Sequence, residues 1–234
     1  GIYSVGNNLG LGMLLFISAV TTAWFPFFMS FKFKLEEAYE VFHKVFKYYL
    51  LIGGGIVICF FMFSETVVSE FFKKEYYSSH HIIGIISLGY FISGMSNFFY
   101  PIFYFNEQVY KITIYQLVST LLFMPICFFL VQEFTIYGGS FSLVIGNSMV
   151  TISIVLHHLY AKNRIDIYKS YSFKLVIFII FLCVLGLLLN YFINNKHIVV
   201  WACIFAFYFF FVTIFFLTKG EKNTFLNLIK NKKM

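Results

Sequence analysis

Residues 204–217 read IFAFYFFFVTIFFL, a run without a charged side chain. Apolar residues occupy successive positions here and do not alternate with polar ones, as the strands of a transmembrane β-barrel would. The uncharged stretch around this run, residues 197–218, is long enough to cross a bilayer as a helix. Of the 234 residues, 60% are hydrophobic and 12% are charged, against about 45–50% and about 25% in a soluble domain. The sequence therefore predicts an integral membrane protein.

Seven uncharged stretches divide the chain, and each reaches the roughly 17–25 residues that a transmembrane helix needs. We therefore predict an all-α polytopic membrane helix bundle with seven transmembrane helices. Between the first two, Leu35, Ala38, Phe42 and Phe46 recur at intervals of three and four residues, which predicts an amphipathic helix on the cytoplasmic surface over residues 33–47. The predicted spans are residues 1–31, 48–64, 82–105, 112–132, 136–160, 175–194 and 198–218.

Basic residues set the expected orientation of these spans through the positive-inside rule. Summed over alternate connections, fourteen of the 17 basic residues fall on one side, and Lys73, Lys74 and Lys196 fall on the other. We therefore expect a cytoplasmic C-terminus and place residue 1 outside. Because Gly1 then begins a hydrophobic segment without a basic flank or a signal peptide, we expect an upstream span and an N-terminal half of the protein. The net charge of +7 does not indicate nucleic acid, because long uncharged stretches separate the lysines.

The predicted spans contain no arrangement of residues suited to catalysis or metal binding. Cys59, Cys127, Cys183 and Cys203 lie in four different predicted spans and have no CxxC spacing, which favours neither a metal site nor a disulfide framework. No Asp, Glu, Lys or Arg occupies the middle of a span, where acid–base chemistry would need one. We therefore predict a protein that is not an enzyme and has no catalytic residue, metal or cofactor.

The first predicted span carries a single polar stripe. Placed at 100° per residue, its six polar side chains fall within an arc of about 140°. One interpretation is helix packing, because small polar residues join helices in membranes and Gly6 and Gly10 form a GxxxG pair. The other is that the stripe faces a water-filled cavity for a polar substrate. The stripe comprises Ser4, Asn7, Asn8, Ser18, Thr21 and Thr22, and the last five are the predicted substrate-binding residues.

Several short motifs occur in a characteristic order. Gly1-Ile2-Tyr3-Ser4-Val5 precedes Ala23-Trp24-Phe25-Pro26-Phe27-Phe28 by about one helix length, and KEYY at 74–77, LGYF at 88–91 and LVQEFTIYGGS at 130–140 follow. In order and spacing these stretches resemble the oligosaccharide flippases of polysaccharide biosynthesis, the O-antigen type within the multidrug, oligosaccharidyl-lipid and polysaccharide exporter superfamily. The resemblance covers roughly residues 1–162. Where that family often carries a basic residue after its first motif, this chain has Asn7-Asn8.

The resemblance implies a flippase in the bacterial inner membrane that moves undecaprenyl-diphosphate-linked oligosaccharide repeat units outward for O-antigen, lipopolysaccharide or capsule synthesis. It implies two pseudo-symmetric bundles, of which this chain would be the C-terminal one. Its expected partners are the lipid-linked oligosaccharide, membrane lipids and the polysaccharide polymerase machinery. Two alternatives remain, a cation-coupled multidrug exporter of the same superfamily and a membrane-embedded polysaccharide polymerase. The exporter needs an acidic residue inside a helix, and the polymerase needs charged external loops, for which Glu65, Glu70 and Glu75 are the candidates.

Overall fold

The computed structural model describes residues 1–32, 35–160, 170–192 and 197–215, and these residues form a helical bundle, which confirms the all-α class. Within these ranges, four segments are long and apolar enough to cross a membrane, residues 2–29, 40–71, 74–105 and 110–158. The last two helices contribute shorter apolar stretches, so the count of seven spans stays a prediction. The α-helices are α1 (Ile2–Gly10), α2 (Gly12–Met29), α3 (Leu35–Phe71), α4 (His80–Met95), α5 (Tyr100–Phe105), α6 (Tyr110–Tyr160), α7 (Ser170–Phe192) and α8 (His197–Phe215), and the 3-10 helices are η1 (Lys74–Ser79) and η2 (Ser96–Phe98).

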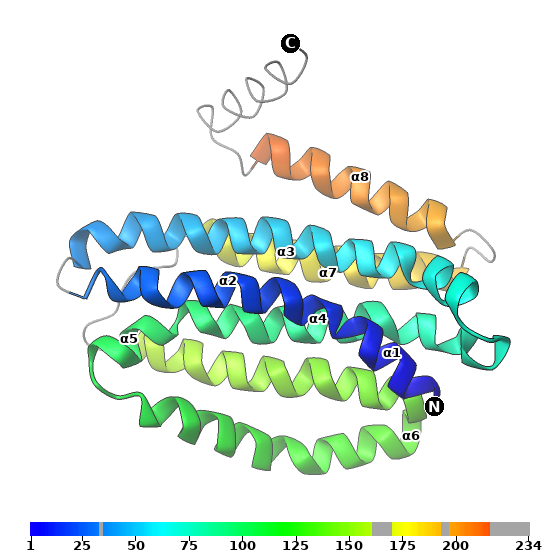
Figure 1. The fold of residues 1–234 in the computed structure, drawn as a ribbon, viewed down its shortest axis with the longest axis horizontal. Helices are drawn as coiled ribbons and strands as arrows, with labels where there is room; N and C mark the ends of the chain where they lie inside the picture. The colour runs from blue at the N-terminus through cyan, green and yellow to red at the C-terminus, as the bar shows by residue number, and fades with distance from the viewer. Residues whose placement is uncertain (33–34, 161–169, 193–196, 216–234) are drawn as a thin grey trace.

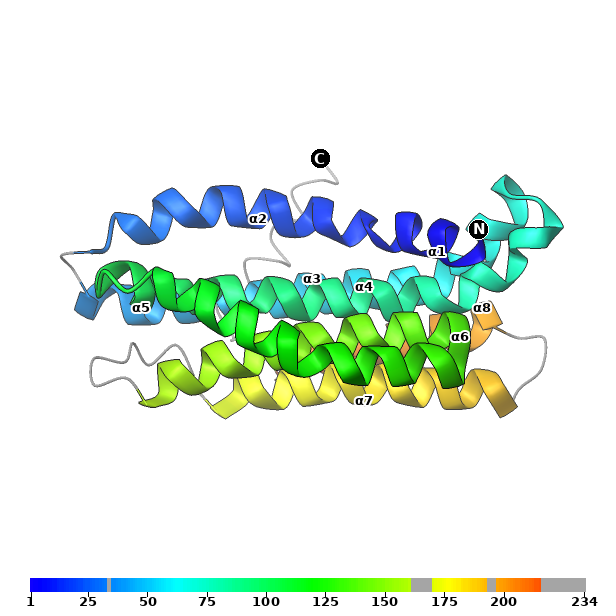
Figure 2. The same ribbon diagram turned by 90° about the horizontal axis from the view of Figure 1, so that it is seen from below.

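The helices run lengthwise beside one another, and α4 lies at the centre of the bundle (Figure 1). It packs against α1, α2, α3 and α6, and most of its residues are buried. Seen from below, α1 and α2 form one outer layer, whereas α6 and α7 lie on the other side of α3 and α4 (Figure 2). The layer formed by α1 and α2 is therefore open on the side that faces away from α4.

The first predicted span is not one straight helix, because a break at Leu11 separates α1 from α2. Gly6 and Gly10 of α1 lie at the contact between α1 and α4. A Cβ atom on Gly6 would lie 2.6 Å from Ile82 Cδ1, and one on Gly10 would lie 2.6 Å from Ile86 Cγ2. The two glycines therefore let α1 approach α4 closely, as the close-packing interpretation of this GxxxG pair expects.

The predicted surface helix over residues 33–47 is not a separate element within the part of the chain that the structure describes. Its described residues continue without interruption into the second predicted span, and together they form α3, which has 37 residues and a length of about 55 Å. Ala38, Phe42 and Phe46 are buried within the bundle, where Phe42 packs on Trp24 at a ring-centroid distance of 4.9 Å. The apolar face of this segment therefore packs against other helices of the chain, which leaves no reason for it to bend onto the membrane surface.

The long helix α6 is a hairpin of two antiparallel arms, residues 110–134 and 136–160, joined at Thr135 (Figure 1). Thr135 has φ of 49° and ψ of −116°, a backbone conformation that β-branched residues seldom adopt. The arms are held together by hydrogen bonds between Tyr115 and His157 at 2.9 Å and between Ser119 and Ser153 at 3.0 Å. These arms correspond to the fourth and fifth predicted spans.

Several sequence expectations concern residues outside the described ranges. The basic residues of 161–169 and of the tail from 216 onward, which carry much of the predicted orientation, are among them. So are residues 33–34 at the start of the expected surface helix, and residues 193–194 and 216–218 at the ends of the last two predicted spans.

Candidate functional site: a polar face on α4 and α5

The central helices α4 and α5 reach the surface through one polar stripe. Between residues 89 and 104, five residues are partly exposed and all the others are buried. Four of the five carry a hydroxyl group and the fifth carries an amide, and they follow one another at intervals of three and four residues, which places them on one side of a helix. We call this stripe the polar face; it consists of Tyr90, Ser93, Asn97, Tyr100 and Tyr104.

Side chains from the helices on both sides are hydrogen-bonded to the polar face. From α2, Thr21 Oγ1 accepts a hydrogen bond of 2.9 Å from Asn97 Nδ2. From the first arm of α6, Gln116 Nε2 donates a long hydrogen bond of 3.5 Å to the Tyr100 hydroxyl, which also accepts one of 3.2 Å from Ser96. The polar surface therefore extends from α2 across η2 and α5 to α6.

A break in the central helix lies directly under the polar face. The third predicted span is interrupted by η2, and α5 begins with Tyr100 and Pro101. Proline has no N–H, so the Asn97 carbonyl four residues earlier lacks its ordinary helical donor. Trp24 Nε1 donates a hydrogen bond of 3.1 Å to this carbonyl oxygen. Two residues of α2 thus hydrogen-bond to Asn97: Trp24 bonds to its backbone carbonyl and Thr21 to its side-chain amide.

The N-terminal end of α1 also contacts α6. Tyr3 lies against Gly139, where an added Cβ atom would be 2.9 Å from Tyr3 Cε2. Asn7 is one helical turn beyond Tyr3 and is half-buried, so it lies on the side of α1 that faces α6. Asn7 therefore lies near the end of the α6 hairpin at which the two arms are joined.

The other residues of the predicted substrate site lie elsewhere on α1 and α2. Asn8, Ser18 and Thr22 are exposed on the open side of these helices, and the Ser18 hydroxyl donates to the Leu15 carbonyl of its own helix at 3.1 Å. Among the five predicted residues, Thr21 is hydrogen-bonded to the polar face, through Asn97. The exposed stripe and the polar face are therefore adjacent surfaces that meet along α2 at Thr21.

The polar face was not predicted from the sequence, in which the polar stripe of the first span was the candidate site. The intervals of three and four residues from Tyr90 to Tyr104 were visible in the sequence. Tyrosines are also common near membrane interfaces, however, so the spacing alone does not single out a site. What identifies the polar face is the structural finding that all other residues between Tyr90 and Tyr104 are buried.

All members of the polar face are neutral side chains, so it offers hydrogen bonds and aromatic rings without a formal charge. Among the residues that the structure describes, no group of three or more His, Cys, Asp or Glu side chains is arranged to hold a metal ion. The cysteines within the described ranges are free thiols. No known family model, curated protein or solved structure matches this chain.

Proposed function

We propose that this chain is part of a flippase that carries a polyprenyl-diphosphate-linked oligosaccharide from the cytoplasmic to the external leaflet of the bacterial inner membrane. The single observation that carries the proposal is the polar face, a continuous row of neutral hydrogen-bonding side chains on the central helix pair of an apolar bundle. The resemblance of the motifs between residues 1 and 162 to oligosaccharide flippases supports the same substrate class.

A polar face on a membrane protein requires an explanation, because hydroxyl and amide groups in hydrocarbon cost several kcal/mol each when they lack partners. The polar face is separate from the groups that pack α4 against α1 and α3. Those contacts are made by glycines, by apolar side chains and by the Tyr49 hydroxyl, which donates a hydrogen bond of 2.7 Å to the Phe91 carbonyl. A water-filled passage beside the face removes this cost. Sugars present hydroxyl groups and apolar C–H surfaces, which hydroxyl, amide and tyrosine side chains can contact together.

In the proposed mechanism the oligosaccharide moves along the polar face while the lipid tail stays in the membrane. Asn97, Tyr100 and Gln116 bind sugar hydroxyls at its centre. The predicted residues Asn7, Asn8, Ser18, Thr21 and Thr22 continue the passage along α1 and α2. Because the face is neutral, the cations that balance the diphosphate come from a second bundle facing α2, which the resemblance implies. No covalent step is involved.

The break between α4 and α5 supports a role in conformational change. Transporters place interrupted helices next to their substrate sites, because backbone groups released there are satisfied by neighbouring side chains or by substrate. Here Trp24 and Thr21 supply such contacts from α2. A small shift of α2 relative to α4 would change both hydrogen bonds to Asn97 and alter the width of the polar face.

The test uses the full-length protein in cells that lack the chromosomal copy of its gene. Gln116→Leu removes an exposed side chain of α6 that is hydrogen-bonded to the polar face at Tyr100, so folding should be preserved. We expect lipid-linked repeat units to accumulate on the cytoplasmic leaflet and surface polysaccharide to fall. Gln132→Leu is the matched control, because it makes the same change at an exposed position on the same arm of α6, sixteen residues away.

Normal export by Gln116→Leu, together with normal export by Tyr100→Phe, would contradict the role of the polar face. Normal surface polysaccharide in cells without the gene would contradict the flippase itself. In that case export of cationic drugs by the same cells is the next measurement, because the cation-coupled exporter is the alternative within the resembled superfamily.

A further inference from the structure

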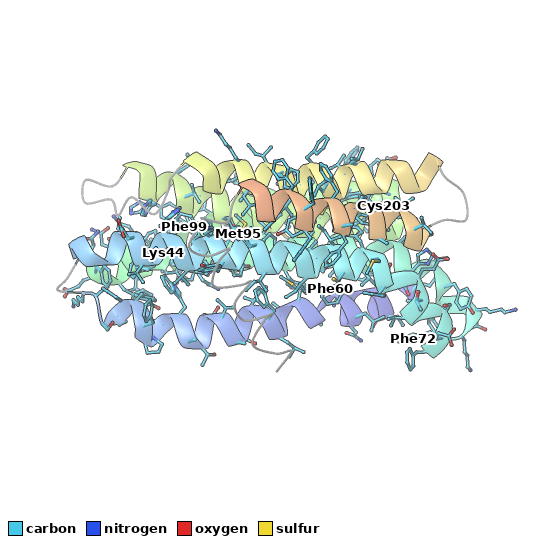
Figure 3. All side chains as sticks on the ribbon, turned by 90° about the horizontal axis from the view of Figure 1, so that it is seen from above. Lys44, Phe60, Phe72, Met95, Phe99 and Cys203 are labelled. Atoms are coloured by element: carbon cyan, nitrogen blue, oxygen red, sulfur yellow. The ribbon has the colours of Figure 1, made fainter. Side chains whose placement is uncertain are left out.

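A cavity of about 250 Å³ lies between α1, α3 and α4, separate from the polar face. Its wall on α3 begins at Ile56 and ends at Val67, and Leu9 of α1 and Ile83 of α4 line other sides. The cavity is open at the surface of the bundle, where the lining residue Phe63 is 48% exposed. Figure 3 shows Phe60 between α3 and the layer formed by α1 and α2, and its ring faces Gly12 of that layer. The lining residues are Leu9, Ile56, Cys59, Phe60, Phe63, Ser64, Val67 and Ile83.

The chemistry of the wall excludes water as a stable occupant. Seven of the eight lining residues are apolar, and the remaining hydroxyl, that of Ser64, donates to the Phe61 carbonyl of its own helix at 2.9 Å. A buried water needs two to four polar partners, and an apolar cavity of about 150 Å³ stays dry and accepts benzene. The present cavity is larger than that and would hold a longer piece of hydrocarbon.

The shape of the cavity favours a chain over a compact molecule. The lining residues of α3 extend from Ile56 to Val67, a distance of about 16 Å along the helix axis. Because α3 is one of the segments suited to crossing a membrane, this long direction follows the direction of lipid chains. The length is about half of the ~30 Å hydrocarbon core, so the cavity matches a chain that enters from one leaflet.

We propose that this cavity is a binding site for a single hydrocarbon chain of a membrane lipid. On the predicted orientation, the end of α3 near Phe71 is external, so the chain belongs to the external leaflet. The inference requires that the protein is embedded in a membrane, but it does not require flippase activity. The lipid would fill the space between α1 and α3, which otherwise have few contacts there, and would hold α1 against α4.

The test is photo-crosslinking in nanodiscs with a phosphatidylcholine that carries a diazirine in one acyl chain, followed by peptide mass spectrometry on the full-length protein. We expect adducts to concentrate on residues 56–67 of α3. The comparison surface is the exposed apolar side of α7, at Ile177, Phe181 and Val184, which we expect to face bulk lipid. We expect Val67→Trp to fill the cavity and cause loss of the α3 adducts, whereas Ile177→Trp leaves them unchanged.

Two outcomes would overturn the proposal. Equal adduct density on residues 56–67 and on the α7 surface would mean that the cavity meets only bulk lipid. Absence of adducts on residues 56–67 in the wild-type protein, while the α7 surface is labelled, would mean that no lipid chain occupies the cavity. If Val67→Trp does not fold, Cys59→Phe provides the second filled variant, and the wild-type adduct pattern decides the question by itself.

Discussion

The hydrogen bond from Trp24 to the Asn97 carbonyl can be tested by restoring the helical donor that Pro101 removes. Trp24→Phe keeps an aromatic ring against Phe42 and Phe98, which lie 4.9 and 5.0 Å from it, but removes the indole N–H. Leaving a fully buried carbonyl without a partner costs about 1–3 kcal/mol, and the part-buried Asn97 carbonyl falls toward the lower end of that range, to which the smaller ring adds a packing loss. We therefore expect Trp24→Phe to lower the free energy of unfolding by more than about 1 kcal/mol.

In a Pro101→Ala background, the alanine introduced at this position has an N–H that can donate to the Asn97 carbonyl, so the indole is no longer the available donor. The free-energy cost of Trp24→Phe should then be smaller by about 0.6 kcal/mol, the average coupling energy of hydrogen bonds between membrane helices. The largest reduction expected is about 1.7 kcal/mol, the highest such coupling. The assay is a double-mutant cycle on the full-length protein, with unfolding followed in mixed micelles of mild and denaturing detergent.

Trp201→Phe is the matched control for the loss of indole volume. Trp201 is fully buried and stacks on Phe61 at 4.4 Å, on the side of the bundle where α8 packs. Its substitution should cost the same amount whether residue 101 is proline or alanine. An equal cost of Trp24→Phe in both backgrounds would refute the reasoning, because the carbonyl would then not depend on the indole.

Three further predictions follow from the geometry of the bundle. Cysteines replacing Ser119 and Ser153 should form a disulfide under mild oxidation, because the two hydroxyl oxygens are 3.0 Å apart; a mobility shift on a non-reducing gel detects it, and its absence would contradict the α6 hairpin. Gly10→Val should destabilise the protein by about 1–3 kcal/mol through overpacking against α4, and an unchanged midpoint of thermal unfolding would argue against that contact. A cysteine at exposed Ser78 should react with an impermeant maleimide from outside, and one at exposed Asn106 only after the cells are opened; the reverse pattern would invert the predicted orientation.

Much of the helical architecture could be predicted from the sequence because membrane-spanning helices leave a strong local signal. The arms of α6 were expected at residues 112–132 and 136–160, and they extend over 110–134 and 136–160. The charged residue between them, Glu133, interrupts the uncharged windows just before the turn at Thr135. A boundary that depends on local composition is therefore predicted accurately.

The continuity of α3 through residues 35–47 could not be predicted in the same way. An alternation of apolar and charged residues indicates that one side of a helix is covered, but it does not identify what covers it. Membrane lipid was the expected cover, whereas the structure places Phe42 and Phe46 against the aromatic rings of Trp24 and Phe98. Those rings lie in other helices, so their proximity was not available from the local pattern.

The sequence by itself determined that this protein is an apolar helical bundle, because the preference of long uncharged runs for helical structure in a membrane is a local property. Only the tertiary structure decided which polar residues share a surface. Asn97 meets Thr21 and Gln116 meets Tyr100 because α2, α4, α5 and α6 pack side by side. The same packing leaves the five residues of the polar face partly exposed and buries every other residue between Tyr90 and Tyr104. Burial could not be predicted locally, because it depends on contacts between segments that are distant along the chain.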